Sequence, residues 1–186
     1  MMRRLDLRWL IVLLANLLLW WMVGTANHYL SRFSFLWMDY CSIHLYIGGL
    51  FVIYSALRLA PNQGWIAVIL TGLMMDSLEP VPFGSNMILL GVVYATLLYG
   101  RRRFPREGSI FGIVVALFAN LFLIIALSFL LVGASPRPGE IWLRIFFDLV
   151  ASQFLILLIT PWFLALQERS MEMARIHPET GRRVAF

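Results

Sequence analysis

Six long apolar runs constrain this chain more than any other feature of its sequence. They cover residues 9–24, 43–60, 64–78, 85–100, 109–133 and 141–166. Short connections that carry most of the charges separate them. A helix that crosses the hydrocarbon core of a bilayer takes about 20 apolar residues, so the short third and fourth runs should lie nearly upright or recruit flanking residues. The pattern predicts an all-α integral membrane protein with six transmembrane helices.

Composition argues against a soluble domain. Hydrophobic residues make up 61% of the chain and charged residues only 13%, which leaves too little polar surface for a soluble protein of this size. The 186 residues have room for one membrane domain, 9–166, between an N-terminal segment, 1–8, and a charged tail, 167–186. The single cysteine, Cys41, excludes an intrachain disulfide framework and a multi-cysteine metal site.

The first apolar run has two interpretations. The small residues Gly24-Thr25-Ala26 follow it and would suit the cleavage site of a secretory signal. We favour an uncleaved span, because the many later runs need no separate signal peptide.

All fifteen basic residues are arginine, and their placement indicates the orientation of the chain rather than a nucleic-acid site. Six spans put both termini on one side of the membrane. Twelve arginines fall on that side: Arg3, Arg4, Arg8, Arg58, Arg101, Arg102, Arg103, Arg106, Arg169, Arg175, Arg182 and Arg183. Three others, Arg32, Arg137 and Arg144, belong to the opposite side or its membrane edge. Because cytoplasmic connections are enriched in basic residues, both termini are expected to be cytoplasmic.

This orientation makes the connection between the fourth and fifth runs a cytoplasmic basic block, formed by Arg101, Arg102, Arg103 and Arg106. Such a block is most simply a determinant of topology. It could also bind anionic lipid or an acidic partner.

Three charged residues lie inside the runs, near the outer surface in this orientation. Asp76 is close to the end of the third run, and Arg144 and Asp148 share one helix face near the start of the sixth. Charged groups at membrane depth are costly unless they are paired or hydrated. We therefore expect a polar cluster in which Asp76 pairs with Arg144, with His44 at a similar level. A structural ion pair that fixes helix packing explains such a cluster as well as a ligand site does.

Other residues in the runs predict helix contacts. Asn16 and Asn120 lie in the middle of their runs and should form interhelical hydrogen bonds. The adjacent small residues Gly48 and Gly49 predict a close approach of two helices.

No catalytic residue, metal site or cofactor is expected. The sequence has no His/Glu pair at metal-ligand spacing, no Gly-rich phosphate loop after a strand and no nucleophile elbow. The remaining enzymatic alternative is an intramembrane aspartyl pair of Asp76 and Asp148. It is disfavoured because Arg144 would keep Asp148 ionised, whereas such a pair shares one proton.

A short motif surrounds the turn between the third and fourth runs. It consists of Gly72-Leu73-Met74-Met75-Asp76-Ser77-Leu78, then Pro82-Phe83-Gly84 and Asn86, then a span closed by Gly100-Arg101-Arg102-Arg103-Phe104. In these residues the chain resembles the rod shape-determining protein MreD family. The specific part of the resemblance covers about residues 64–104, and Glu79-Pro80-Val81 departs from the small residues that are more common in the family.

The resemblance implies a non-enzymatic, multi-pass scaffold in the bacterial inner membrane that serves cell shape and peptidoglycan synthesis. Such a protein would bind an MreC-like scaffold protein. Through it the protein would reach the RodA glycosyltransferase, its transpeptidase partner and, indirectly, the MreB filament. The implied fold is similar to the substrate-binding component of energy-coupling-factor transporters, which gives the alternative function, a membrane subunit that binds a vitamin for uptake.

The lengths of the outer connections favour the scaffold over the transporter. A vitamin-binding subunit needs an outer lid and convergent polar groups, and only residues 25–42 are long enough to form a lid. For a scaffold, the candidate partner-binding surface is the turn that carries Glu79, Val81, Phe83 and Asn86. A turn stiffened by prolines loses little conformational entropy when it docks.

Overall fold

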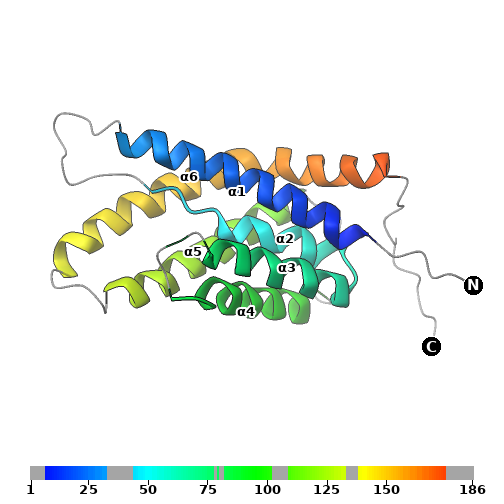
Figure 1. Ribbon diagram of the computed structural model, residues 1–186, viewed down its shortest axis with the longest axis horizontal. Coiled ribbons are helices and arrows are strands. Elements are labelled where there is room, and N and C mark those ends of the chain that lie inside the picture. The colour runs from blue at the N-terminus through cyan, green and yellow to red at the C-terminus, as the bar shows by residue number, and fades with distance from the viewer. Residues whose placement is uncertain are drawn as a thin grey trace, which may run out of the picture.

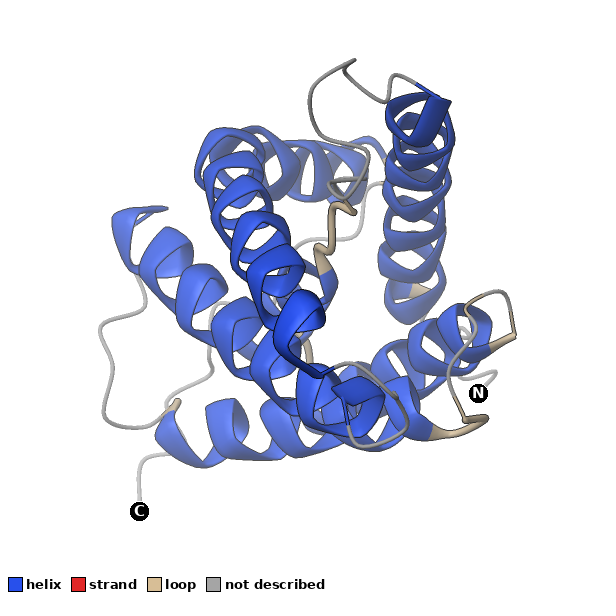
Figure 2. Cartoon of the chain, turned by 90° about the vertical axis from the view of Figure 1, so that its left-hand side faces the viewer, coloured by secondary structure: helices blue, strands red, loops and turns tan. Residues whose placement is uncertain are grey.

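The computed structural model describes residues 7–32, 44–77, 79, 82–101, 109–132 and 138–174. This part of the chain is helical and contains no β-strand (Figure 2). The helices are α1 (Arg8–Arg32), α2 (Gly48–Arg58), α3 (Pro61–Asp76), α4 (Ser85–Gly100), α5 (Ser109–Val132) and α6 (Pro138–Met173). The predicted all-α fold is confirmed.

The helix lengths divide the elements into two groups. α1, α5 and α6 contain stretches long and apolar enough to cross a membrane, Arg8–Leu30, Ile110–Leu130 and Arg144–Met173. α2 has 11 residues, a rise of about 16 Å, and α3 and α4 have 16 each, a rise of about 24 Å. Of the six predicted spans, three therefore have helices of full crossing length.

Helix bounds differ from the predicted spans mainly in α1, α2 and α6. α1 continues to Arg32, well past residue 24. α2 begins at Gly48 rather than at residue 43, because residues 44–47 are not helical. α6 extends to Met173, so the predicted boundary at residue 166 falls inside a continuous helix. α4 has the predicted bounds, 85–100.

α2 is the centre of the bundle. It contacts every other helix, and its residues from Gly48 to Ala56 are all buried. Figure 1 shows α1 and α6 along one side of the molecule and α4 along the opposite side, with α2 and α3 between them. The start of α1 and the end of α6 lie at the same end (Figure 1).

The outer faces of the long helices are apolar. Their exposed large side chains include Leu14, Leu18 and Trp21 on α1, Phe118, Phe122 and Phe129 on α5, and Phe146, Phe154, Leu158 and Trp162 on α6. Exposed apolar surface of this extent is unusual for a protein in water and suits contact with lipid. Together with the three helices of crossing length, it suggests a membrane protein.

A buried polar network crosses the centre of the bundle. The Asn16 amide donates hydrogen bonds to the Phe51 carbonyl (3.3 Å) and the Thr71 hydroxyl (3.2 Å). The Gln167 amide donates to the Asn16 side-chain oxygen at 3.2 Å. These contacts join α1, α2, α3 and α6, and confirm the interhelical role predicted for Asn16. Gln167, which the sequence placed in the charged tail, is fully buried.

Candidate functional site

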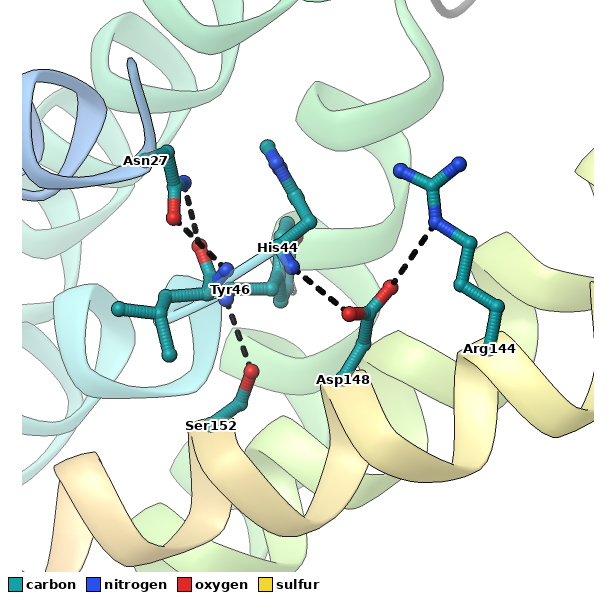
Figure 3. Close-up of polar contacts among 7 residues, drawn as sticks. Asn27, His44, Tyr46, Arg144, Asp148 and Ser152 are labelled. Carbon is teal, nitrogen blue, oxygen red and sulfur yellow. Dashed lines mark hydrogen bonds and ion pairs between the residues drawn. The ribbon is translucent and has the colours of Figure 1, made fainter. Parts of the chain in front are cut away.

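The segment 44–47, directly before α2, is held by side chains instead of helical hydrogen bonds (Figure 3). Asp148 accepts the His44 N–H at 2.7 Å, and Ser152 accepts the Tyr46 N–H at 2.9 Å. The Asn27 amide pairs with both backbone groups of Leu45, at 2.8 and 2.9 Å. Side chains of α1 and α6 thus replace the partners that a helical turn would supply.

Asn120 of α5 completes this arrangement from the other side. Its amide donates to the Tyr46 carbonyl at 3.2 Å, and its side-chain oxygen accepts the Gly49 N–H at 3.2 Å. An unbonded backbone group at membrane depth costs several kcal/mol. The segment can therefore leave the helical conformation only because α1, α5 and α6 present polar side chains at matching heights. The interhelical role predicted for Asn120 is confirmed.

Arg144 has a weaker part in the same region. Its Nε lies 3.9 Å from Asp148 Oδ2, as the spacing of four residues predicts, but its side chain is 49% exposed. This contact is long compared with the 2.7 Å hydrogen bond from the His44 N–H to the same carboxylate. Asp148 therefore acts mainly by holding the His44 N–H.

Asp76 forms the second polar centre, at the start of α4. Its carboxylate accepts three backbone N–H groups, from Gly84 (3.0 Å), Asn86 (2.8 Å) and Met87 (3.1 Å). Gly84 has φ 94°, a left-handed conformation that suits glycine, and it turns the chain so that these groups converge. The carboxylate also lies at the positive end of the α4 dipole. Asp76 thus caps a helix that follows it in sequence.

The predicted pairing of Asp76 with Arg144 is wrong. Within the described residues, Arg144 lies in ion-pair range of Asp148, and the Asp76 carboxylate is bonded to the backbone of the next helix. The pairing was predicted on the ground that a carboxylate at this depth needs a charged partner. Three N–H groups at a helix start serve the same purpose, because they satisfy the oxygens and supply a favourable dipole.

Glu79 and Asn86 connect the two centres. The Asn86 amide donates to Glu79 Oε2 at 2.9 Å, and the Tyr46 hydroxyl donates to the Asn86 side-chain oxygen at 3.1 Å. Tyr46 belongs to the segment before α2, so this chain of hydrogen bonds joins the starts of α2 and α4. Asn27, Tyr46 and Ser152 were not predicted as site residues. The only signal of Tyr46 and Ser152 was a polar atom within an apolar run, and Asn27 lies in the stretch 25–42 that was predicted as a connection.

The candidate partner-binding residues are not equivalent in the structure. Phe83 is 75% exposed, whereas Asn86 is fully buried. Asn86 cannot touch a partner directly, and it is corrected to a residue that supports the turn. Glu79 is partly buried, and Val81 lies outside the described residues.

Glu79 should make the stability of the protein depend on pH. Burial raises the pKa of its carboxyl above the ordinary 4.5, against hydrogen bonds from Asn86 and Trp20 that lower it. A raised folded-state pKa contributes stability that is complete below pH 4.5 and is lost as pH rises through the folded value. Glu79→Gln keeps the oxygen that accepts from Asn86, so its unfolding midpoint in detergent should fall less than that of the wild type between pH 4 and 7.

The control for this measurement is Glu172→Gln, which removes an exposed carboxyl from α6. Its pH profile should follow the wild type. If Glu79→Gln also followed the wild type, ionisation of the buried carboxyl would not be what lowers stability.

The arginine-rich end of the bundle is organised by two described residues. The Arg101 guanidinium donates to the Leu59 carbonyl at 2.7 Å, next to the last residue of α2. Arg58 pairs with Glu168 at 2.9 Å and joins α2 to α6. The other members of the predicted basic block, Arg102, Arg103 and Arg106, lie outside the described residues.

The polar groups at these two centres have a structural role. The carboxylates and amides at the starts of α2 and α4 are bonded to backbone groups or to one another, and the described residues contain no group of three or more metal-ligating side chains. The arrangement can fix the positions of two helix starts and can present Phe83 on a stiff turn. No family model, curated protein or solved structure matches the chain.

Proposed function

We propose that this protein is a non-enzymatic scaffold of the bacterial inner membrane, similar to the MreD family, that acts in the cell-elongation complex. The observation that carries this proposal is that polar side chains at the starts of α2 and α4 are bonded within the chain. Asp76, Asp148 and Asn27 are bonded to backbone groups of the chain itself. A protein that binds a small molecule or catalyses a reaction needs convergent polar groups that are free to meet it.

The proposal includes six spans with both termini in the cytoplasm. The common location of the start of α1 and the end of α6 supports an even number of crossings (Figure 1). α2 is short, but the four residues 44–47 can add up to about 13 Å to its rise of about 16 Å. Together they approach the hydrocarbon thickness of roughly 30 Å.

The partner proposed for the scaffold is an MreC-like protein, and Phe83 is the residue offered for contact. Its aromatic ring is exposed beside Gly84 and just before α4. Asp76 and Asn86 fix the backbone below it, so docking would order little that is not already ordered. Exposed aromatic side chains on rigid supports commonly dominate binding energy at interfaces.

Phe83→Arg is expected to abolish capture of the MreC-like partner in a gentle-detergent pull-down, with a loss of at least tenfold, since truncating a central anchor costs about 2 kcal/mol or more. In a rod-shaped host the cells should become round. The yield and unfolding midpoint of the protein should stay unchanged, because the ring is outside the core.

The matched control is Tyr99→Arg, which changes an exposed aromatic residue at the opposite end of α4. It should leave partner capture and cell shape intact. Normal capture by Phe83→Arg would contradict the proposed docking surface.

One observation favours the alternative, uptake of a small molecule. Polar side chains from three helices converge on the non-helical residues 44–47 just before α2, and non-helical backbone at membrane depth lines substrate sites in many transporters. Recovery of an ATPase module with the purified protein, or of a vitamin bound to it, would overturn the scaffold proposal.

A further inference from the structure

We propose that Arg144 and Asp148 bind the zwitterionic headgroup of phosphatidylethanolamine, with its phosphate on the guanidinium and its ammonium on the carboxylate. The two side chains lie one turn apart on α6, with Arg144 Nε 3.9 Å from Asp148 Oδ2. Figure 3 shows the guanidinium beside the carboxylate, with its two terminal nitrogens pointing away from it. A positive and a negative group are therefore presented together.

Both side chains keep polar atoms that the described part of the chain does not use. Asp148 Oδ1 accepts the His44 N–H at 2.7 Å, whereas Oδ2 accepts no hydrogen bond from a described residue. The 3.9 Å between Arg144 Nε and Asp148 Oδ2 is too long for a hydrogen bond. The Arg144 side chain is half exposed. A ligand that carries one anion and one cation would supply partners for both groups.

The position of the pair along α6 indicates that this ligand is a lipid. Arg144 is the first residue of Arg144–Met173, the stretch of α6 that is long and apolar enough to cross a membrane. The pair therefore lies where the hydrocarbon meets the headgroups. A long arginine side chain at this level extends its charge toward the interface.

An exposed apolar stripe continues along α6 from the pair. It consists of Phe147, Phe154 and Leu158, which are all exposed. Successive residues of a helix are about 100° apart, so these three lie within about 80° of Arg144 around the helix. The rise from Phe147 to Leu158 is about 16 Å, close to half of the roughly 30 Å hydrocarbon core. One acyl chain can lie on the stripe while its headgroup meets the pair.

The charges of the pair select the headgroup. A guanidinium binds phosphate through two parallel hydrogen bonds. The neighbouring carboxylate repels a headgroup of net negative charge, such as that of phosphatidylglycerol. It accepts hydrogen bonds from a primary ammonium, which has three N–H donors, but the quaternary ammonium of phosphatidylcholine has none. Of these three lipids, only phosphatidylethanolamine satisfies both side chains.

The test measures the lipid that the full chain retains after gentle extraction from vesicles. The vesicles contain the three phospholipids in equal amounts and with identical acyl chains. Mass spectrometry of the purified protein should find phosphatidylethanolamine in about tenfold excess over each of the others, the factor that one hydrogen bond to a charged group supplies. Equal retention of the three lipids would overturn the proposal.

Two variants separate the charges of the pair. Asp148→Asn keeps an oxygen that can accept the His44 N–H but removes the negative charge. The excess over phosphatidylcholine should disappear, and phosphatidylglycerol should become the preferred lipid. Arg144→Gln should lower the retained phosphatidylethanolamine by about tenfold. The wild-type preference in either variant would contradict binding of the headgroup by this pair.

Arg169→Gln is the matched control, because it makes the same change at an exposed position near the other end of α6. It should keep the wild-type lipid preference, and both arginine variants should unfold at the wild-type midpoint. Loss of the preference in Arg169→Gln would show that the effect is not specific to Arg144.

Two further measurements separate a lipid from a soluble zwitterion. Phe154→Ser interrupts the stripe and should lower the retention of all three lipids without changing their ratio. Free phosphoethanolamine in excess should not displace the bound lipid, because it has no chain to lie on the stripe. Full retention by Phe154→Ser, or displacement by phosphoethanolamine, would overturn the assignment to a lipid.

Discussion

Asp76→Ala is expected to lower the free energy of unfolding by about 3–5 kcal/mol, because it leaves three backbone N–H groups at the start of α4 without their acceptor. Asp76 is 4% exposed, so water cannot readily replace the carboxylate. The loss should appear as a lower unfolding midpoint in detergent and as faster proteolysis of the turn before α4.

Two further variants separate the backbone contacts of Asp76 from charge pairing. Asp76→Asn keeps one side-chain oxygen and should lose only part of the stability. Arg144→Ala should have a small effect, and its loss should add to that of Asp76→Ala, since the two side chains have no shared partner. A non-additive double variant would show that the two charges interact after all.

The sequence was informative about the helices because their signal is local. Apolar runs and turn residues predicted six helices, and the bounds of α4 were predicted correctly. The non-helical conformation of residues 44–47, before α2, was not predictable in the same way. Leu45 and Tyr46 are as compatible with a membrane helix as their neighbours. The side chains that bond to the backbone of this segment, including Asn27 and Asp148, are distant in sequence.

The candidate site shows a related limit. The sequence identified Asp76, Arg144 and Asp148 as the residues that need an explanation, because charge at membrane depth is rare. It identified the contact of Arg144 with Asp148, but not the backbone N–H groups that the two carboxylates accept. Backbone N–H groups are present at every residue except proline, and only the turn at Gly84 determines that three of them point at one carboxylate.

The two polar centres together place α2 relative to α4. The hydrogen bonds from Tyr46 to Asn86 and from Asn86 to Glu79 connect the segment before α2 with the turn before α4. A change at the start of either helix should therefore displace Phe83, the exposed residue of the turn before α4. For a scaffold, this rigidity would keep the partner-binding surface in one conformation.

Gly49→Ala is expected to cost about 3 kcal/mol, because it forces α2 away from α5. A Cβ added at Gly49 would lie 2.7 Å from the Asn120 Cα, a contact with backbone that a rotamer change cannot relieve. The shift would also stretch the hydrogen bond from the Gly49 N–H to the Asn120 side chain, at 3.2 Å. The Asn120 amide would then hold Tyr46 less well, so the segment before α2 should become easier to cleave.

Two other glycines provide the controls for Gly49→Ala. A Cβ at Gly91 would meet Trp65 at an ordinary 3.5 Å, so Gly91→Ala should be tolerated although the site is buried. A Cβ at Gly24 would meet nothing within 4 Å, and Gly24→Ala should stabilise α1 by up to about 1 kcal/mol through its helix propensity. Unfolding midpoints of the three variants in one detergent test the ranking. If Gly49→Ala had the same unfolding midpoint as Gly91→Ala, the added Cβ would not clash with α5. The two helices would then be too far apart for Asn120 to bridge them as described.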